Sequence, residues 1–142
     1  MSLQNLVRIG SLVEQAPDPA EVARRLDAAS RSLADAAHSD LSPESRFDLA
    51  YKAVMHCAIA ALRARGYRLS TSQPGHHQTA IQTLILTVEF ERTRTHALDA
   101  MRRKRNGIDY EADSVSDSMA QSCIAEATYL LEVATRAIGP SP

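Results

Sequence analysis

The chain has 142 residues, of which 44% are hydrophobic and 23% are charged, and its formal net charge is -1. Disordered chains contain fewer apolar residues and carry more net charge, so this composition indicates a single folded domain over residues 1–142. Only 4% of the residues are aromatic and Trp is absent. Because β-sheets favour aromatic and β-branched residues, an all-β fold is excluded and an all-α fold is predicted.

Proline and glycine are gathered in short clusters, and the segments between the clusters are long enough for helices of several turns. Both residues are costly inside helices, so the clusters mark helix ends. Connections this short place successive helices in opposite directions. We therefore expect an antiparallel, up-and-down bundle of four main helices over residues 18–138, preceded by a short helix within residues 1–16.

The N-terminal segment is amphipathic but contains a glycine. Its apolar residues include Leu3, Leu6 and Leu12, while Gly10 weakens the helical pattern. Its apolar face can pack in two ways, either against the domain's own bundle or against a second subunit. The second arrangement would make this segment a dimer contact.

Capping residues give the expected starts of the main helices. Asp18 stands before a proline and is followed by Glu21, which can reach back to the cap, and Ser42 also stands before a proline. Ser114, with Asp117 three residues later, is the third candidate cap. Glycines that follow basic last turns are expected to end helices. They are Gly66, Gly107 and Gly139.

Apolar residues recur at alternating spacings of three and four residues, which places them on one face of each predicted helix. Each face needs a partner, and the bundle supplies it. The expected core residues are Val22, Leu26, Ala29, Leu33 and Ala36; Phe47, Ala50, Tyr51, Val54, Ala58, Ala61 and Leu62; Ile81, Leu84, Ile85, Val88, Leu98 and Met101; and Val115, Met119, Cys123, Ala127, Leu130, Ala134 and Ile138.

The sequence favours the cytoplasm. Cys57 and Cys123 lie in apolar segments, and two cysteines are too few for a disulfide scaffold or a zinc site. A membrane helix needs about 18 consecutive apolar residues, and no such run occurs. Arg8 falls where a signal peptide would be apolar. We expect no metal, no other cofactor and no membrane contact.

The most unusual local feature is the basic run formed by Arg102, Arg103, Lys104 and Arg105. Residues 92–105 carry a net charge of +5, whereas residues 108–142 carry -5. One interpretation is a phosphate-binding patch, because arginine can hold a phosphate through two hydrogen bonds. The other is structural, since cations favour the last turn of a helix and the acidic segment can neutralise them.

The same region resembles the signature of the HEPN superfamily, the higher eukaryotes and prokaryotes nucleotide-binding domains. Residues 98–110, LDAMRRKRNGIDY, carry the likeness. Three further stretches are similar in order and spacing to small bacterial HEPN proteins, which also have an Arg-Asn followed four residues later by Tyr. They are residues 46–51 (RFDLAY), residues 60–68 (AALRARGYR) and residues 74–77 (PGHH). The resemblance covers residues 44–138 and implies a helical bundle that usually dimerises.

Catalytic members of this superfamily cleave RNA without a metal, using an Arg that is followed some residues later by His. Here Arg105 and Asn106 match the first two positions, but Tyr110 stands where the histidine is expected, and no His follows His96. Tyrosine, with a pKa near 10, is a poor proton shuttle at neutral pH. The resemblance therefore implies an RNA- or nucleotide-binding or regulatory module without the nuclease histidine.

This interpretation assigns the binding site to the basic helix end. The expected ligands of RNA or of a nucleotide are Arg102, Arg103, Lys104, Arg105, Asn106 and Tyr110. The resemblance also implies a defence or toxin-antitoxin setting, a homodimer, and a partner protein such as a nucleotidyltransferase or a toxin.

Three alternatives remain open. The first is a metal-independent endoribonuclease that uses Tyr110, Asp109 or a histidine of a second subunit. The second is a purely structural bundle that docks on a partner protein. The third is a DNA-binding helix-turn-helix protein, which is disfavoured because recognition helices usually present their N-terminal residues, and the positive charge here stands at a helix end.

The other histidines are expected to be structural. In a continuous helix from His76 to Arg105, the two ends would lie roughly 40 Å apart, so His77 is not expected to act with Arg105 in one chain. His76 and His77 are adjacent and therefore point about 100° apart, unlike a metal-binding pair. His56 beside Cys57 is expected to be a core histidine next to a packed thiol.

Overall fold

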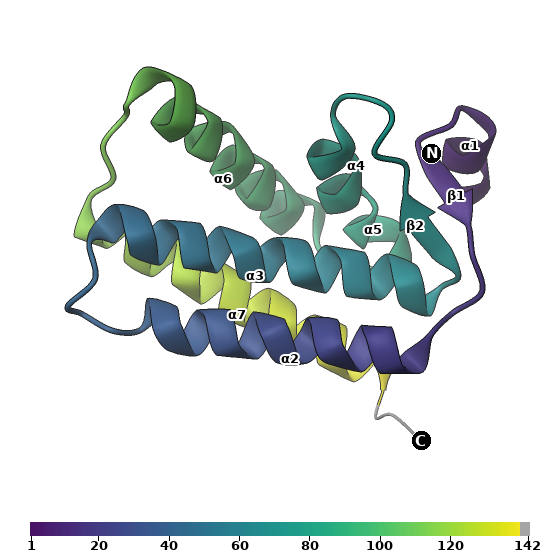
Figure 1. Ribbon diagram of the computed structural model, residues 1–142, viewed down its shortest axis with the longest axis horizontal. Helices are drawn as coiled ribbons and strands as arrows, with labels where there is room; N and C mark the ends of the chain where they lie inside the picture. The colour runs from purple at the N-terminus through teal and green to yellow at the C-terminus, as the bar shows by residue number, and fades with distance from the viewer. Residues whose placement is uncertain (140–142) are drawn as a thin grey trace.

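The structure is a computed structural model that describes residues 1–139, and it is mostly helical (Figure 1). This confirms the predicted all-α character. In chain order the elements are α1 (Leu3–Arg8), β1 (Leu12–Glu14), α2 (Pro19–Ala36), α3 (Pro43–Ala64), β2 (Tyr67–Leu69), α4 (His76–Gln82), α5 (Leu84–Thr87), α6 (Arg92–Glu111) and α7 (Asp117–Ile138). None of the helices in this part of the chain is long and apolar enough to cross a membrane.

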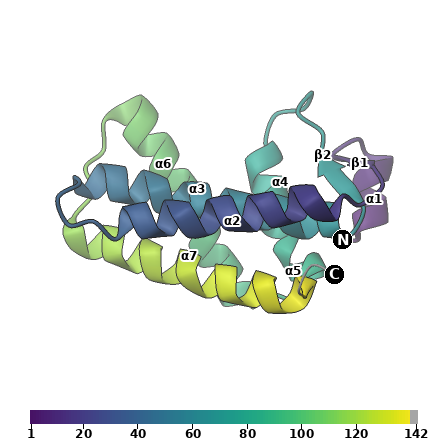
Figure 2. The same ribbon diagram turned by 60° about the horizontal axis from the view of Figure 1, so that its bottom comes forward.

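Three long helices form the main core. α2, α3 and α7 lie side by side, with α3 in contact with both neighbours, and α2 runs opposite to the other two (Figures 1 and 2). α6 diverges from these three helices, and its C-terminal end stands apart from them in both views. α6 contacts both α3 and α7, but its C-terminal end lies away from them.

The predicted apolar stripes face this core. The α2 stripe is buried except for the half-buried Leu26, and every residue of the α3 stripe is buried. On α7 the stripe is less complete, because Met119 is 38% exposed. Many of the core positions are alanine, and small side chains allow helix axes to approach closely. The fully enclosed alanines are Ala29, Ala36, Ala50, Ala53, Ala58, Ala60, Ala80, Ala120, Ala127 and Ala134.

Two of the three predicted caps are confirmed. The Asp18 carboxylate accepts hydrogen bonds from the first turn of α2, and the Ser42 hydroxyl accepts one from the first turn of α3. The third prediction is wrong by two residues, because Ser116 rather than Ser114 caps α7 by accepting from the Met119 amide. Local sequence thus located these helix starts to within two positions.

Gly66 and Gly139 follow the ends of α3 and α7 with positive φ, as predicted, but Gly107 does not end a helix. α6 continues to Glu111 and ends at Ala112, which has a φ of 56°. A Cβ atom at Gly107 would collide with the Asp113 side chain, which folds back against the helix. This glycine therefore provides space for a returning loop instead of a helix stop.

The N-terminal segment packs against its own chain, which is the first of the two arrangements considered for its apolar face. β1 pairs with β2 in an antiparallel two-stranded sheet in which Leu12 is opposite Leu69. α1 packs beside this sheet, and its leucines form a second small core with Leu62 of α3. The sequence did not predict these short strands.

Arg63 of α3 connects the N-terminal segment to the helices through hydrogen bonds. Its side chain is 3% exposed, and its guanidinium donates to Glu21 of α2 and to the carbonyls of Gln15, Ala16 and Tyr67. Glu21 therefore pairs with a distant arginine instead of reaching back to the cap of α2. One buried cation thus links α2, α3, β2 and the segment after β1.

The expected continuous helix from His76 to Arg105 is wrong. The chain turns after α4 and again between α5 and α6, so α4 packs against α6. At the second turn Glu89 has a φ of 54°, and Phe90 is buried with its amide donating to the Leu84 carbonyl. A buried aromatic ring holds this turn in place, and neither glycine nor proline marks it.

Candidate functional site

The four cations of the basic run do not form one patch, because successive helical residues point about 100° apart. Arg102 and Arg103 both pair with Asp99 of the same helix, at 2.8 and 3.0 Å. Arg102 is largely covered, with a side chain 19% exposed, whereas Arg103 is 65% exposed. These two positive charges therefore share one carboxylate within α6.

The acidic C-terminal segment neutralises part of the basic region, as the structural interpretation expected. Lys104 Nζ lies 4.0 Å from Asp113, and Arg94 lies 3.2 Å from Glu126 of α7. Arg94 also lies over the ring of Tyr129, 3.9 Å from its centroid. Only some of the basic side chains are left to meet a ligand.

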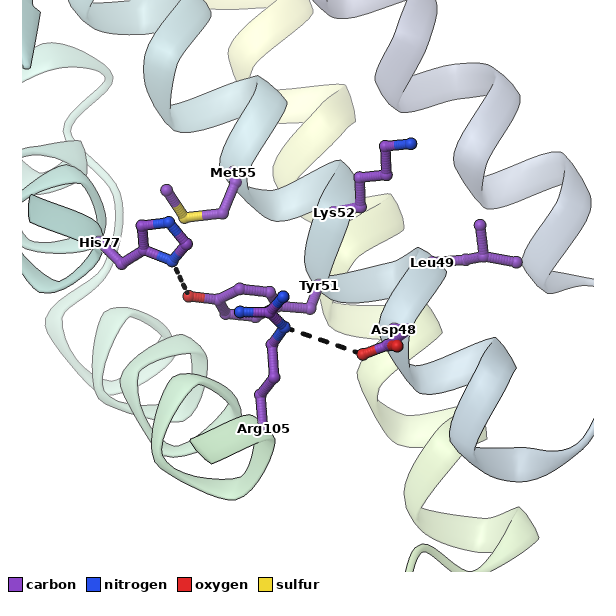
Figure 3. A pocket seen from close by; sticks show the side chains of 7 residues that line it. All are labelled: Asp48, Leu49, Tyr51, Lys52, Met55, His77 and Arg105. Carbon is purple, nitrogen blue, oxygen red and sulfur yellow. Dashed lines mark hydrogen bonds and ion pairs between the residues drawn. The ribbon is translucent and has the colours of Figure 1, made fainter. Parts of the chain in front are cut away.

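Arg105 is the member of the run that reaches another helix. Its Nε lies 3.8 Å from Asp48 Oδ1 of α3, and its guanidinium carbon lies 5.1 Å from the centroid of the Tyr51 ring (Figure 3). Both partners of the ion pair are exposed, 37% for Arg105 and 60% for Asp48. Such pairs add little stability, so an incoming anion can replace Asp48.

Tyr51 connects Arg105 to a histidine. Its side chain is buried, and burial raises the pKa of the hydroxyl to about 12, although Arg105 and Arg102 oppose this shift. The hydroxyl lies 3.0 Å from His77 Nδ1. Burial, together with the neighbouring His76 and Arg105, lowers the pKa of His77. If a neutral imidazole accepts the tyrosine hydrogen at Nδ1, its Nε2 carries the remaining proton and can donate it to a ligand.

These groups line an open pocket of about 360 Å³ between α3, α4 and α6 (Figure 3). Its apolar wall contains Met55, and Lys52 stands at the rim with its ammonium group directed away from Arg105. The full lining is Asp48, Leu49, Tyr51, Lys52, Met55, His77 and Arg105. We call this hollow the Arg105 pocket.

The expectation that His77 lies far from Arg105 is wrong, because both side chains line this one pocket. The turns on either side of α5 bring the start of α4 back beside the second half of α6. His77, Tyr51, Asp48 and Lys52 were not among the predicted site residues. The sequence did contain a signal for these four residues. Asp48, Tyr51 and His77 lie in the stretches 46–51 and 74–77 that carry the family resemblance, and Lys52 directly follows the first stretch.

The other predicted site residues lie elsewhere. Asn106 is exposed on α6 and does not cap it, and Tyr110 is 85% exposed on the last turn. Asp109 is also exposed. None of the three lines the Arg105 pocket, whereas Arg103 lines a different hollow with Arg92 and His96. The structure therefore brings Arg105 alone, of the predicted six, to this pocket.

The chemistry of the Arg105 pocket is that of an anion site with a proton donor. Arg105 can offer two parallel N–H groups to a phosphate, and His77 can donate from Nε2. Cys57 and Cys123 are buried thiols, and burial raises their pKa values to about 12 and about 11, which disfavours the nucleophilic thiolate. Over residues 1–139, no group of three or more potential metal ligands comes together.

Comparison with known proteins gives no match, either among family models or among curated protein sequences. The likeness to the HEPN superfamily therefore stays a prediction from the motifs.

Proposed function

We propose that the protein is a HEPN-like RNA- or nucleotide-binding module whose Arg105 pocket holds a phosphate group. The observation that carries this proposal is the placement of Arg105. The guanidinium is oriented by the Tyr51 ring, is partly exposed, and is paired with the carboxylate of Asp48 only at 3.8 Å. A side chain held in place but weakly neutralised is suited to exchange its carboxylate partner for a phosphate.

His77 and Lys52 support the same ligand chemistry. His77 adds a donor whose orientation is set by the Tyr51 hydroxyl, and Lys52 adds positive charge at the rim. The leucine and methionine of the pocket wall give an apolar surface against which a base or ribose can rest. Phosphate recognition by Arg105 and packing against this wall together favour a nucleotide unit over a free phosphate ion.

The test is titration of fluorescein-labelled single-stranded RNA at low and at physiological salt. Arg105→Gln should weaken binding about tenfold, because it removes a charge-assisted pair of hydrogen bonds. Arg136→Gln on α7 is the matched control, since Arg136 is exposed and lines neither the Arg105 pocket nor the hollow beside it. Equal losses for the two variants, or salt-independent binding, would contradict the proposal.

A second candidate, metal-independent RNA cleavage, is favoured by the presence of His77 in the same pocket as Arg105. His77 would accept the proton of a ribose 2′-hydroxyl through Nε2 in its other tautomer, while Arg105 holds the phosphate. The new bond joins the 2′-oxygen to phosphorus, and the bond from phosphorus to the 5′-oxygen breaks. The products are a 2′,3′-cyclic phosphate and a 5′-hydroxyl that takes up a proton. Tyr110 and Asp109 are the other candidates for the acid-base residue.

Cleavage is tested by incubating end-labelled RNA with the wild-type chain in a chelator. His77→Gln should abolish formation of the cyclic phosphate while retaining RNA binding, and Tyr110→Phe and Asp109→Ala should leave it unchanged. Absence of products with clean wild-type protein eliminates this candidate. Absence of RNA binding as well would favour the structural bundle that docks on a partner protein.

The remaining parts of the proposal concern assembly and setting. It includes a four-helix antiparallel bundle as the family architecture, a homodimer, a cytoplasmic location, and a role in a defence or toxin-antitoxin system with a nucleotidyltransferase or toxin as partner. Light scattering on the purified protein tests the dimer directly. A monomer at all concentrations would restrict the proposal to a single-chain site.

A further inference from the structure

A second open pocket adjoins the Arg105 pocket. It also measures about 360 Å³, and the two pockets share Met55 and His77 in their linings. The second pocket extends from there along α3 toward β2, where Arg68 and Thr71 line it. His76 contributes from the start of α4, with its ring 4.8 Å from that of His77. The two hollows therefore meet at Met55 and His77, and His76 lies on the side of the second pocket.

Cations dominate the combined lining. Five Lys or Arg side chains face the two pockets against two carboxylates, although the whole chain carries a net charge of -1. The five cations are Arg25, Lys52, Arg63, Arg68 and Arg105, and the two carboxylates are Asp48 and Glu21. Positive charge is thus concentrated along this side of α3.

Arg68 is the cation of the second pocket that is available to a ligand. The donors of Arg63 are used by Glu21 and three backbone carbonyls, and Arg25 lies 3.8 Å from Glu21. Arg68 is exposed, and across residues 1–139 it has no carboxylate within ion-pair distance. It stands at the middle of β2 between Tyr67 and Leu69, which pack against the core clusters.

From these observations we infer that the pocket lined by Arg68 and His76 is a second anion subsite, so that the protein selects ligands with two phosphate groups over ligands with one. The ligand class is an oligonucleotide segment, with one phosphate at Arg105, a second near Arg68, and the connecting nucleoside over Met55. This inference rests on the proposed function, because it takes the Arg105 pocket as the first phosphate site.

The experiment compares two uridine dinucleotides by calorimetric titration. UpU has a single phosphodiester, and pUpU differs from it only by a 5′-phosphate. The wild-type chain should bind pUpU about tenfold more tightly than UpU, as expected for one added charge-assisted contact. Arg68→Gln should remove this preference and leave the affinity for UpU unchanged. Arg105→Gln should weaken both ligands, and Arg136→Gln should change neither.

The outcomes separate the two proposals. If UpU binds but wild-type protein shows no preference for pUpU, or if Arg68→Gln keeps the preference, the second subsite is overturned and the proposed function stands. If Arg136→Gln lowers the preference as much as Arg68→Gln does, general charge attraction replaces a built subsite and the inference is again overturned. If neither dinucleotide binds to the wild-type chain, both proposals fail.

Discussion

The two sides of α3 differ in how they are built. One side packs against α2 and α7 through regular apolar stripes, and its contacts are almost entirely buried. The other side faces α4 and α6. Ile81, Leu84 and Leu98 join the same buried core there, but the Arg105 pocket stays open and contains an exposed ion pair and a cation over a ring. Burial of apolar surface dominates folding stability, whereas exposed pairs contribute little. The first side, called the core side below, should therefore determine most of the stability. The second, called the pocket side, should determine binding.

The largest expected effect on stability comes from a cavity in the core side. Leu130 of α7 is fully buried, so Leu130→Ala should lower the free energy of unfolding by about 2–5 kcal/mol. Leu131→Ala is the control, because the next residue is only partly buried. Urea unfolding measures both. Equal losses for the two leucines would mean that α7 is not packed as described.

Arg63 tests a polar contact that belongs to the core side. Arg63→Met leaves Glu21 and three carbonyls without their buried donor, and removing one partner of a buried pair costs about 3 kcal/mol. Arg65→Met provides the comparison, because Arg65 is exposed and its guanidinium donates to the Leu86 carbonyl. Thermal unfolding should show a large loss for the first variant and a small one for the second.

A smaller effect is expected on the pocket side, from the pH dependence of binding. The pKa of His77 is lowered in the free protein by burial and by His76, Arg105 and Arg102, so the imidazole is neutral at pH 7.5. A bound phosphodiester favours the imidazolium and raises that pKa, so binding takes up a proton. The affinity for UpU, whose diester does not titrate in this range, should therefore rise roughly threefold from pH 7.5 to pH 5.5.

Two controls sharpen this pH measurement. His77→Gln should flatten the profile, and the Tyr51 hydroxyl, with a pKa of about 12, stays protonated throughout. His56 also has a lowered pKa, first because of burial and then because of Arg25, but it lies outside the Arg105 pocket. His56→Gln should therefore keep the rise in affinity. A flat wild-type profile would remove His77 from the binding site.

The smallest expected effect concerns the turn that joins the two sides. Glu89 has a φ of 54°, which costs a non-glycine residue about 1 kcal/mol, so Glu89→Gly should raise the free energy of unfolding by up to that amount. Ala125→Gly, at an exposed position inside α7, should instead lower it by a similar amount. A destabilised Glu89→Gly variant would show that the Glu89 side chain contributes a contact worth more than its strain.

The core side was predictable from sequence because its signals are local. Spacings of three and four residues identified the α2 and α3 faces, and a capping residue before proline located both helix starts. The pocket side depends on contacts between distant residues. The turn at Glu89 contains no glycine or proline that would mark it in the sequence. Gly107 was predicted to end a helix, but the glycine instead makes room for the Asp113 side chain, a contact that exists only in the folded loop.

The candidate site was predicted only in part for the same reason. Arg105 stood out as part of a charge run, but the run alone could not show that Asp99 and Asp113 pair with its other members. The prediction that His77 is remote from Arg105 rests on a continuous helix, which the turns on either side of α5 interrupt. The two-stranded sheet was missed because strands of three residues carry too little alternation to detect.

The pairing of β1 with β2 has a consequence for the order of folding. The two strands are far apart in sequence, and α2 and α3 lie between them. Closing a long flexible loop is slow, but an antiparallel helix pair brings the start of α2 beside the end of α3 and shortens the effective loop. The helix pair should therefore form first and the sheet later. The N-terminal segment then has to wait, during synthesis, until β2 has left the ribosome.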